Sequence, residues 1–432
     1  MQAADILILS NGPGEVTTWV RPVVKALRQQ LGDDRLLVRI SVVLSPCANG
    51  TGKEAAIAQS YPEVDRVQGA EHFFPFLLRG KTAENWDWRK KGVVVFLGGD
   101  QIFPVLIGKR LGYRTVIYAE WEARWHSSIN RFGVMKPQII ATVPKKYNDK
   151  FTVVGDLMAD VGLQISRLQV ATSDLPSNLQ PSTELIGLLP GSKPAKLMQG
   201  VPLSLAIAQF IHAQRPQTRF VLPFAPTLYF STLAGFANPQ QNPLIQQLGW
   251  GEAKLIFPNP ETQDKAWLET PSGLCIELWR KFPAYDLLSQ CHLCLTTVGA
   301  NTAELGSLAV PMIVLLPTQQ LDAMRAWDGV LGILARLPGI GSGLVRIINV
   351  IMIQQILRQK RLFSWPNIWA KAEIVPELFG AVQPIEVAQL AIDYLKQPTK
   401  LEEMRSRLRT VRGQPGAAQK LAQLVREELD QD

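Results

Sequence analysis

The chain has 432 residues, 47% of them hydrophobic and 19% charged, and this length and composition predict a globular protein of two or three domains. Its formal net charge of +8 favours anionic partners, such as nucleotide phosphates, acidic lipid surfaces or nucleic acid. Four unevenly spaced cysteines indicate a reducing compartment, and we expect neither a signal peptide nor a membrane-spanning helix from the apolar runs.

Short apolar runs alternate along the chain with segments of helical periodicity. Several runs are apolar nearly throughout, which is typical of parallel strands covered on both faces, and strands separated by helices predict a doubly wound α/β sheet. The expected strands are 5–9, 37–44, 92–99, 114–119, 138–142 and 151–155 in the first half, and 184–190, 219–225, 274–278, 291–297 and 311–317 in the second.

Residues 166–183 interrupt this alternation with many Ser, Pro, Asn and Gln residues. We interpret them as an interdomain linker, because the same order of strand, glycine-containing loop and helix begins again after them. The sequence therefore predicts two similar α/β domains, residues 1–165 and 184–403. Ligands commonly bind between such domains, at the carboxyl ends of the strands.

The first predicted strand leads into SNGPGEV, which places Asn11, Gly12 and Gly14 directly before Glu15. The glycines permit close approaches that a Cβ forbids, and a helix starting here would point free N–H groups at a ligand. The alternative is an ordinary tight turn with a glutamate at the helix start. Thr17 stands where a dinucleotide-binding motif would have its third glycine, so that motif is absent.

Another predicted strand ends in Gly98-Gly99-Asp100. An aspartate at the carboxyl end of a strand is a candidate general base if it faces an interdomain cleft. The alternative is an aspartate that only forms the turn.

The segment LLPGSKPAK is the best phosphate candidate. Gly191 and Ser192 follow a predicted strand, and Lys193 and Lys196 bring two cations to the expected helix start. Backbone donors, a hydroxyl and lysines suit a diphosphate. The alternative is a strand–turn–helix unit with solvated lysines.

A third loop, in LTTVGANTAEL, turns at Gly299 and places Asn301, Thr302 and Glu304 in or near the first helical turn. A carboxylate there can accept both hydroxyls of a ribose while the helix start faces a phosphate. The alternative is a helix cap with a glutamate matched to the helix dipole.

Two further features are ambiguous. Cys291 and Cys294 flank a histidine, but the sequence has no second pair of metal-ligating residues nearby. Strand positions three apart also point to opposite faces, so we predict buried free cysteines and no metal site. Residues 325–361 interleave basic and apolar residues, which favours an element at a membrane surface over buried helices.

Together these features resemble the lipid-A-disaccharide synthase family, which are glycosyltransferases of the GT-B type. LLPGSK resembles that family's Leu-Leu-Pro-Gly-Ser-Arg, and VGANTAELGSLAVPMIV resembles its Ser-Gly-Thr-Ala-Thr-x-Glu segment with the following Gly-x-Pro-Met-Val. WPNIWAKAEIVPELF, at 365–379, is similar to a third motif, and GQPGAAQKLAQLV to the family's last helix. The resemblance covers essentially the whole chain.

The resemblance implies two Rossmann-like domains facing a cleft, with the acceptor bound by residues 1–165 and the nucleotide sugar by 184–403. A C-terminal helix at about 404–432 would pack back on the first domain. The acceptor half departs from the family: Asp100 fits the first of two expected aspartates, and AEWEARW offers Glu120 and Glu122 where the family has Ser-Pro-x-x-Trp-Ala-Trp.

The function implied is transfer of a sugar from a UDP-sugar, of the UDP-GlcNAc type, to a lipid or membrane-associated acceptor. We expect direct displacement without a metal or other cofactor, by a cytoplasmic protein on the inner face of a membrane that forms a homodimer and binds no nucleic acid. The alternatives are a UDP-sugar 2-epimerase on the same fold and a non-catalytic lipid- or sugar-binding descendant.

Roles follow for the candidate residues. Asp100, or else Glu15 or Glu120, would take the proton of the acceptor hydroxyl. Lys193 and Lys196 would stabilise the departing diphosphate, so that no metal is required. The resemblance also assigns the ribose to Glu304 and completion of the donor pocket to Asn367.

Overall fold

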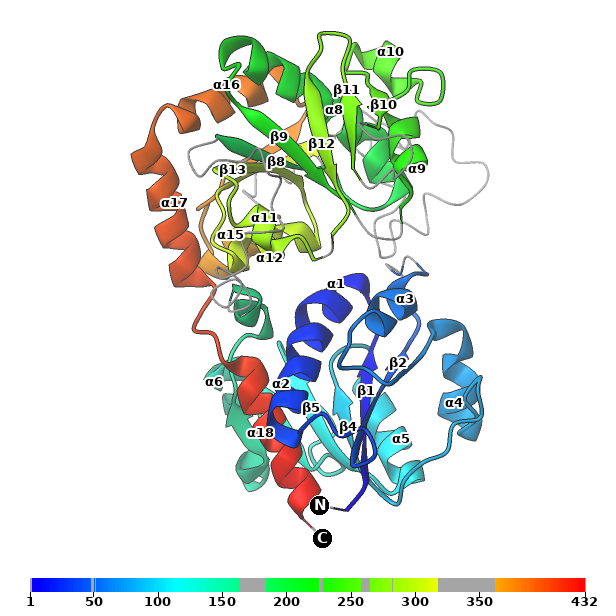
Figure 1. The fold of residues 1–432 in the computed structure, drawn as a ribbon. Helices are drawn as coiled ribbons and strands as arrows, with labels where there is room; N and C mark the ends of the chain where they lie inside the picture. Colours follow the sequence, from blue (N-terminus) through cyan, green and yellow to red (C-terminus); the bar gives the residue numbers. More distant parts are fainter. Residues whose placement is uncertain are drawn as a thin grey trace, which may run out of the picture. The chain divides into compact units, whose positions relative to one another are not determined.

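Two separate sheets, one parallel and one mostly parallel, organise the protein in this computed structural model. The structure describes residues 2–47, 50, 52–162, 184–224, 228–257, 265–281, 283–317 and 362–431. The chain divides into unit 1, residues 1–163 with 413–432, and unit 2, residues 164–412 (Figure 1). The expected linker at 166–183 and the expected membrane-surface segment at 325–361 both lie outside the described residues.

Unit 1 contains a seven-stranded sheet in the order β3-β2-β1-β4-β5-β6-β7, and every neighbouring pair is parallel. Its strands are β1 (Ala4–Ser10), β2 (Val38–Leu44), β3 (Arg66–Gln68), β4 (Lys91–Phe96), β5 (Arg114–Ala119), β6 (Arg131–Val134) and β7 (Phe151–Val153). Its α-helices are α1 (Pro13–Glu15), α2 (Arg21–Leu31), α3 (Glu54–Gln59), α4 (Phe73–Arg79), α5 (Ile102–Leu111), α6 (Pro137–Ala141) and α18 (Ala417–Asp430). A π-helix spans Val16–Val20, and 3₁₀ helices span Ala70–His72, Lys145–Lys150 and Leu157–Gly162.

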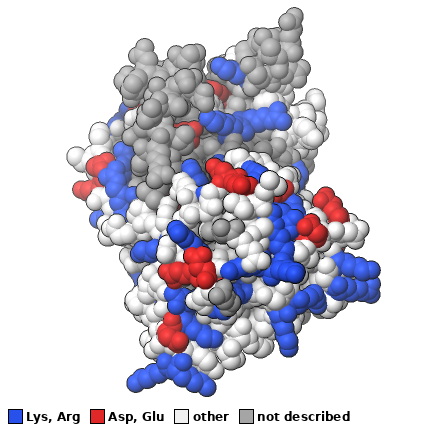
Figure 2. All heavy atoms as spheres, turned by 60° about the horizontal axis from the view of Figure 1, so that its bottom comes forward, with Lys and Arg blue, Asp and Glu red and all other residues white. Residues whose placement is uncertain are grey.

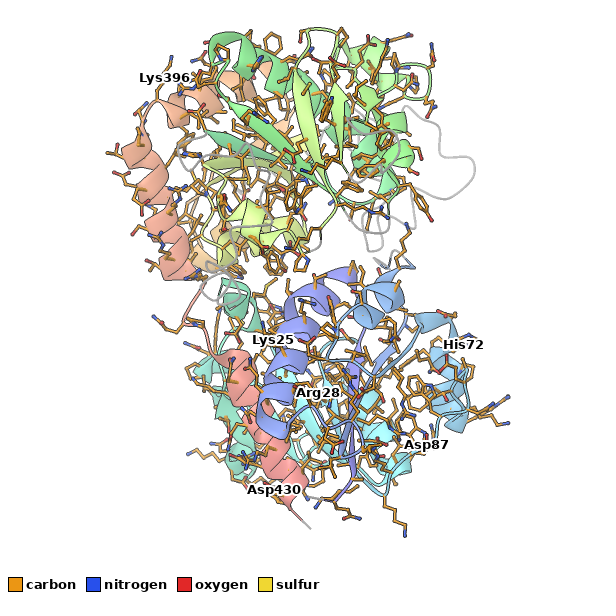
Figure 3. All side chains as sticks on the ribbon, viewed as in Figure 1. Lys25, Arg28, His72, Asp87, Lys396 and Asp430 are labelled. Atoms are coloured by element: carbon orange, nitrogen blue, oxygen red, sulfur yellow. The ribbon has the colours of Figure 1, made fainter. Side chains whose placement is uncertain are left out.

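Helices cover both faces of this sheet, with α2 and α18 on one side and α4 and α5 on the other (Figure 1). All seven residues of β1 are buried, as expected for a parallel strand that is covered twice. From α2, Arg28 extends toward the sheet (Figure 3), where it donates to the Val38 carbonyl at 2.8 Å and to Asp65 at 2.6 Å. This buried cation therefore ties α2 to the edge of the sheet.

One predicted strand is wrong. Residues 138–142 belong mostly to helix α6, because Pro137 sets a helical φ at the first helical position and has no N–H to lose there. The strand at this position in the sheet is β6. Its sequence, RFGV, is too short and too polar to be recognised by an apolar pattern.

Unit 2 contains an eight-stranded sheet in the order β10-β11-β12-β9-β8-β13-β14-β15. Its strands are β8 (Leu185–Leu189), β9 (Arg219–Pro223), β10 (Lys254–Ile256), β11 (Ala266–Glu269), β12 (Cys275–Trp279), β13 (Leu293–Thr297), β14 (Met312–Pro317) and β15 (Glu377–Gly380). Its helices are α8 (Pro194–Gln214), α9 (Phe230–Phe236), α10 (Leu244–Leu248), α11 (Tyr285–Leu288), α12 (Ala300–Ser307), α15 (Trp365–Ala370), α16 (Pro384–Leu395) and α17 (Pro398–Val411). The sheet is parallel except that β11 pairs antiparallel with β10 and with β12.

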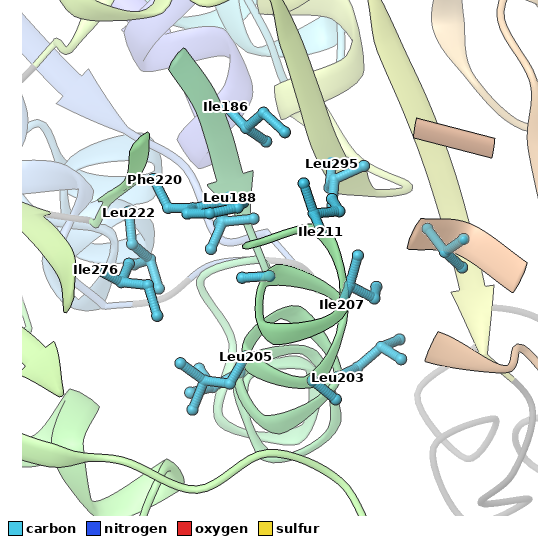
Figure 4. Packing of buried hydrophobic residues seen from close by; sticks show 14 of the residues in the cluster. Ile186, Leu188, Leu203, Leu205, Ile207, Ile211, Phe220, Leu222, Ile276 and Leu295 are labelled. Atoms are coloured by element: carbon cyan, nitrogen blue, oxygen red, sulfur yellow. The ribbon is translucent and has the colours of Figure 1, made fainter. Parts of the chain in front are cut away.

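The core of unit 2 forms where α8 packs on the sheet. Ile207 and Ile211 of α8 pack in one buried cluster with Leu188 of β8 and Leu295 of β13 (Figure 4). Because α16 packs against another side of α8, the helix is apolar over most of its surface, as buried helices are.

The two cysteines of the CHLC segment are free and buried, as predicted. They do not point apart, however: a Cβ built on Gly187 would lie 2.7 Å from Cys294 Sγ and 3.2 Å from Cys291 Sγ. The alternation rule fails because β13 begins only at Leu293, so Cys291 lies outside the strand.

Each sheet has one point where the strand order reverses. In unit 1 the first strand, β1, lies between β2 and β4; in unit 2 the first strand, β8, lies between β9 and β13. Ligands of doubly wound sheets bind at such points, beyond the carboxyl ends of the strands. Within the described part of the chain, no helix is both long and apolar enough to cross a membrane.

Candidate active site

The first candidate region lies at the reversal point of unit 1. The Leu97 N–H donates to the Leu9 carbonyl at 2.7 Å, which aligns the ends of β4 and β1. Gly98 has φ +150°, and a Cβ there would lie 2.7 Å from Asn11 Oδ1 and 3.3 Å from Glu15 Cγ. Only glycine fits this close approach, so the loops after β1 and β4 meet at one place.

The loop SNGPGE does more than turn the chain. It begins α1, and the wider π-helical turn that follows is held by two hydroxyls: Thr17 Oγ1 donates to the Pro13 carbonyl at 2.9 Å, and Thr18 Oγ1 to the Gly14 carbonyl at 2.8 Å. π-Helical turns often occur at functional sites. The turn leaves the Glu15 carboxylate folded over Gly12, next to Cys47 Sγ, and burial raises the pKa of Glu15.

Glu120 follows β5 at the same edge of the sheet. Burial raises its pKa to about 7, and the negative charges of Asp156 and Glu15 add to this, against a hydrogen bond from Trp121 and the charge of Lys136. A carboxyl group with this pKa can exchange a proton near neutral pH.

Asp156, which follows β7, belongs to the same group of acids. Burial raises its pKa to about 6, although its Oδ1 accepts the Met158 N–H at 2.9 Å. Tyr118 of β5 holds the segment around Asp156 to the sheet, because its hydroxyl donates to the Gly155 carbonyl at 3.3 Å and accepts the Leu157 N–H at 3.2 Å. Sequence reasoning missed Asp156, although the rule that singled out Asp100, an acid directly after a strand, applies equally to VVGD.

Asp100 has different surroundings. Its Oδ1 accepts the Ile102 N–H at 2.9 Å at the start of α5, and its Oδ2 lies 3.5 Å from Arg124 Nη2. Its side chain is 46% exposed. Arg124 Nε also lies 3.3 Å from Glu122, so Asp100 and Glu122 share one cation. The turn-forming role considered for Asp100 is therefore present in the structure, beside any role in catalysis.

The second candidate region lies at the reversal point of unit 2. Lys193 is the N-cap residue of α8, and Lys196 Nζ donates to the Val298 carbonyl at 2.6 Å, across to the loop before α12. Gly191 has φ +103° and Gly299 has φ +150°, values that favour glycine. The starts of α8 and α12 therefore meet at one place, with a lysine between their loops.

The remaining donor-side residues divide into two groups. Ser192 is exposed, while Asn301 and Glu304 are half-buried, Glu304 one turn into α12. Thr302 is buried: its hydroxyl donates to the Gly299 carbonyl at 2.8 Å and accepts the Trp365 N–H at 3.2 Å. Thr302 therefore fixes the loop before α12.

Asn367 is fully buried inside unit 2. Its amide nitrogen donates to the Val375 carbonyl at 2.8 Å and to Glu377 at 2.7 Å, and its oxygen accepts the N–H groups of Ile374 at 2.7 Å and Val375 at 3.0 Å. These four bonds use both donors and both acceptor positions of the amide. Asn367 therefore fastens α15 to β15.

Among the described residues, no group of three or more His, Cys, Asp or Glu side chains is arranged to hold a metal ion. Within unit 2 the structure brings together the lysines and the starts of α8 and α12. Within unit 1, separately, it gathers a group of acids.

No family model matches the chain. The chain is 22% identical over 337 residues to a lipid-A-disaccharide synthase of Geobacter metallireducens, across 75% of this chain and 71% of that protein. It is 23% identical to the synthase of Geobacter sulfurreducens and 20% identical to that of Nitrosococcus oceani, spanning about half of each relative: 50% and 46%.

Among solved structures, the fold matches a UDP-GlcNAc 2-epimerase from Neisseria meningitidis bound to UDP-GlcNAc, with a TM-score of 0.51, 12% identity and 99% of each chain covered. A second match is the MnaA protein of S. aureus in complex with UDP, with a TM-score of 0.50, 11% identity, and 99% of this chain and 97% of that chain covered. The fold is of the GT-B class. The predicted GT-B architecture of two Rossmann-like units is thus confirmed, and the named sequence relatives support a GT-B relationship.

Proposed function

We propose that the protein is a glycosyltransferase that takes its sugar from a UDP-sugar. The observation that carries this proposal is the meeting of two helix starts with Lys196 at the reversal point of unit 2, in the two segments that most resemble the lipid-A-disaccharide synthase family. The names of the sequence relatives support a transferase. The UDP-GlcNAc and UDP complexes of proteins with this fold support a uridine nucleotide as ligand.

The donor side of the reaction follows from these groups. The bond between the anomeric carbon and the diphosphate breaks, and the negative charge that develops on the diphosphate is stabilised by Lys193, Lys196 and the positive ends of the helix dipoles of α8 and α12. We expect these groups to suffice without a metal ion or another cofactor. Desolvation and the nearby Lys193 lower the pKa of Lys196, and a bound anion would raise that pKa again.

On the acceptor side, a hydroxyl oxygen of the acceptor forms the new bond to the anomeric carbon, and its proton passes to a carboxylate. We propose Glu120 as the first candidate for this base, because its surroundings poise it near neutral pH, while Asp100 already binds the Ile102 N–H and Arg124. Asp100 and Glu15 are the next candidates. The acceptor remains a lipid or a membrane-associated sugar.

Calorimetric titration with UDP tests the donor site. Lys196→Met should weaken UDP binding at least tenfold, since it removes a cation at the junction of the two loops. Lys396→Met, at the end of α16 (Figure 3), is the matched control and should leave the affinity unchanged. Equal affinities of the wild type and Lys196→Met would remove this junction from the donor site.

A UDP-sugar 2-epimerase is the second candidate, and the matches to epimerase structures favour it. An epimerase converts UDP-GlcNAc into a new nucleotide sugar, whereas a transferase releases UDP when an acceptor is present. Proton NMR of UDP-GlcNAc incubated with the protein and a membrane lipid extract distinguishes the two. A non-catalytic descendant would bind UDP-GlcNAc and give neither product.

We also propose that the protein works at a membrane surface. Helices α4 and α5 pack together and expose Phe74, Leu78 and Leu106, with Arg79 and Lys109 on the same helices. Basic side chains are also spread over the face shown in Figure 2, with smaller acidic groups between them. Exposed apolar residues beside cations suit an anionic bilayer.

Vesicle flotation tests this surface. Binding to phosphatidylglycerol vesicles should weaken as salt rises, because charges are screened over about 8–10 Å at physiological ionic strength. The variant Phe74→Ser/Leu78→Ser should bind less than the wild type at every salt concentration. Absence of binding at low salt would overturn the proposed membrane association.

A further inference from the structure

Unit 1 contains a pocket of about 370 Å³ beyond the ends of β1, β2 and β3. Its volume falls within the range of small-molecule sites. Asn11, Ser45, Cys47, Glu54 and Glu71 contribute polar side chains to its lining, together with the backbone of glycines. All of these residues belong to unit 1.

The lining is polar and built into the fold. Ser45 is 2% exposed and Glu54 is 6% exposed, and Glu54 is held in place by accepting the Gly52 N–H at 3.0 Å. Asn11 Oδ1 is buried and has no hydrogen-bond partner in the described structure. Buried polar atoms are nearly always hydrogen-bonded, so an unpaired one beside a pocket indicates that a ligand or water completes it.

The charge of the lining is one-sided. Its described residues include two carboxylates, and none of them is Lys, Arg or His. Glu54 is buried, whereas the Glu71 side chain is 70% exposed and lies 4.0 Å from His72. A phosphate there would face the like charges of both carboxylates, which costs free energy, most of all beside the buried Glu54. Hydroxyl groups, in contrast, can donate to the carboxylates and to the amide oxygen of Asn11.

The pocket also adjoins the Glu15 carboxylate. Cys47, which lines it, and the Glu15 carboxylate both flank Gly12, where a Cβ would lie 3.4 Å from Cys47 Sγ. A hydroxyl-rich molecule in the pocket would therefore lie close to Glu15.

We propose that this pocket binds the uncharged, hydroxyl-bearing sugar end of the acceptor and that Glu54 and Glu71 exclude a phosphate from it. This inference rests on the proposed glycosyltransferase function, because only a transferase has an acceptor.

Alkylation of Cys47 tests the pocket directly. The other three cysteines are Cys275, which is exposed, and Cys291 and Cys294, which are buried. In a Cys275→Ser background, the rate of iodoacetamide labelling in the native protein therefore reports access to Cys47. The probes are the methyl glycoside of N-acetylglucosamine and N-acetylglucosamine 1-phosphate, each at up to about 50 mM, because isolated sugars bind with Kd values in the millimolar range.

The methyl glycoside should slow labelling at least threefold, and the 1-phosphate should have little effect. Glu71→Gln should allow the 1-phosphate to protect Cys47, since one repelling charge is gone. Glu403→Gln, an exposed position on α17, removes the same charge elsewhere and should behave as the wild type. Equal or better protection by the 1-phosphate in the wild type, or no protection by the methyl glycoside, would overturn the proposal.

This experiment separates the two proposals. Labelling requires neither donor nor turnover. Protection by the neutral sugar in a protein that binds no UDP would therefore support the pocket proposal and contradict the glycosyltransferase proposal. UDP binding without protection would do the reverse.

Discussion

At the scale of single residues, Glu120 and Asp100 follow neighbouring strands at one edge of the sheet, yet they differ in exposure and in the charges near them. Asp100 is half exposed and lies next to Arg124, whereas Glu120 is partly buried near Asp156 and Glu15. Under the proposed function we therefore expect Glu120 to be the proton acceptor. Asp100 accepts the Ile102 N–H at the start of α5 and lies next to Arg124.

The raised pKa of Glu120 predicts a pH-dependent stability. Its pKa is about 7 when folded and near the ordinary 4.5 when unfolded, so between these values the folded state holds a proton that the unfolded state has lost. Stability should therefore fall as pH rises from about 4.5 to 7. Glu120→Gln cannot ionise, and its melting temperature should fall less between pH 5 and pH 8 than that of the wild type.

The same residue gives a readout in activity. If Glu120 is the base, the wild-type rate should rise with pH and level off above about 7, and Glu120→Gln should lose about 10²–10⁴ in turnover with little change in UDP affinity. Asp100→Asn is the companion variant. If only Asp100→Asn abolishes turnover, Asp100 is the base and Glu120 is not.

Asn367 and Glu304 should separate stability from binding. Asn367→Ala leaves the N–H groups of Ile374 and Val375 without their partner, so it should destabilise unit 2 by about 2–3 kcal/mol. Glu304→Ala should destabilise the protein less than Asn367→Ala, because Glu304 is only half-buried, but weaken UDP binding by about 1.5–3 kcal/mol, the value of a charge-assisted hydrogen bond. Calorimetry and thermal denaturation of both variants check this; the opposite pattern would exchange their roles.

At the scale of elements, the loop before α12 depends on Gly299. Gly299→Ala forces a side chain into φ +150° and places its Cβ 3.3 Å from Lys196 Nζ, so it should displace the lysine and weaken UDP binding about tenfold. Gly380→Ala is the matched control, because Gly380 has φ +113° with nothing within 4 Å of a Cβ. The Gly380→Ala variant introduces backbone strain but makes no contact with Lys196. If both variants bind UDP equally well, the Lys196 contact has no part in binding.

The elements show what the sequence could predict. Long β-branched strands such as β1 and β4 were recognisable because both faces are buried, so their apolar runs are nearly unbroken. Three-residue strands such as β3 and β10 were missed, because neighbouring strands rather than their own composition hold them in the sheet. In the segment that forms α6, the apolar run alone predicts a strand, whereas Pro137 at its start favours a helix.

The candidate site was predictable to a similar degree. Glycines that need positive φ mark a loop in the sequence, and Gly191 and Gly299 do have positive φ in the loops before α8 and α12. Hydrogen-bond partners leave no such mark. The full use of the Asn367 amide by its own unit, and the burial that sets the pKa of Glu120, arise from residues distant in sequence.

At the scale of the whole molecule, the chain completes unit 1 only with its last segment. Residues 413–432 belong to unit 1 although they follow unit 2 in the sequence, and the two termini lie close together in unit 1 (Figure 1). Asp160 accepts the N–H groups of Gly416 and Ala418 at the start of α18, and Arg114 binds Glu428 at its other end at 2.5 Å. A carboxylate at a helix N-terminus also matches the helix dipole.

Removal of α18 should therefore unfold unit 1 selectively. The helix buries Leu421, Leu424, Val425 and Leu429, which contribute roughly 6–12 kcal/mol at 1.5–3 kcal/mol for each side chain, as much as the net stability of a typical domain of about 5–15 kcal/mol. A chain ending at residue 412 should lose hydrogen-exchange protection in β1, β4 and β5, keep it in β8 and β13, and still bind UDP.

Two further variants serve as controls for this experiment. Asp160→Asn keeps the apolar contacts and weakens only the hydrogen bonds at the start of α18, so its loss of protection should be smaller and confined to unit 1. A chain shortened only by its last two residues should behave almost as the wild type. Protection lost equally in both sheets of the chain ending at 412 would mean that the units unfold together, and α18 would then stabilise the whole protein rather than unit 1.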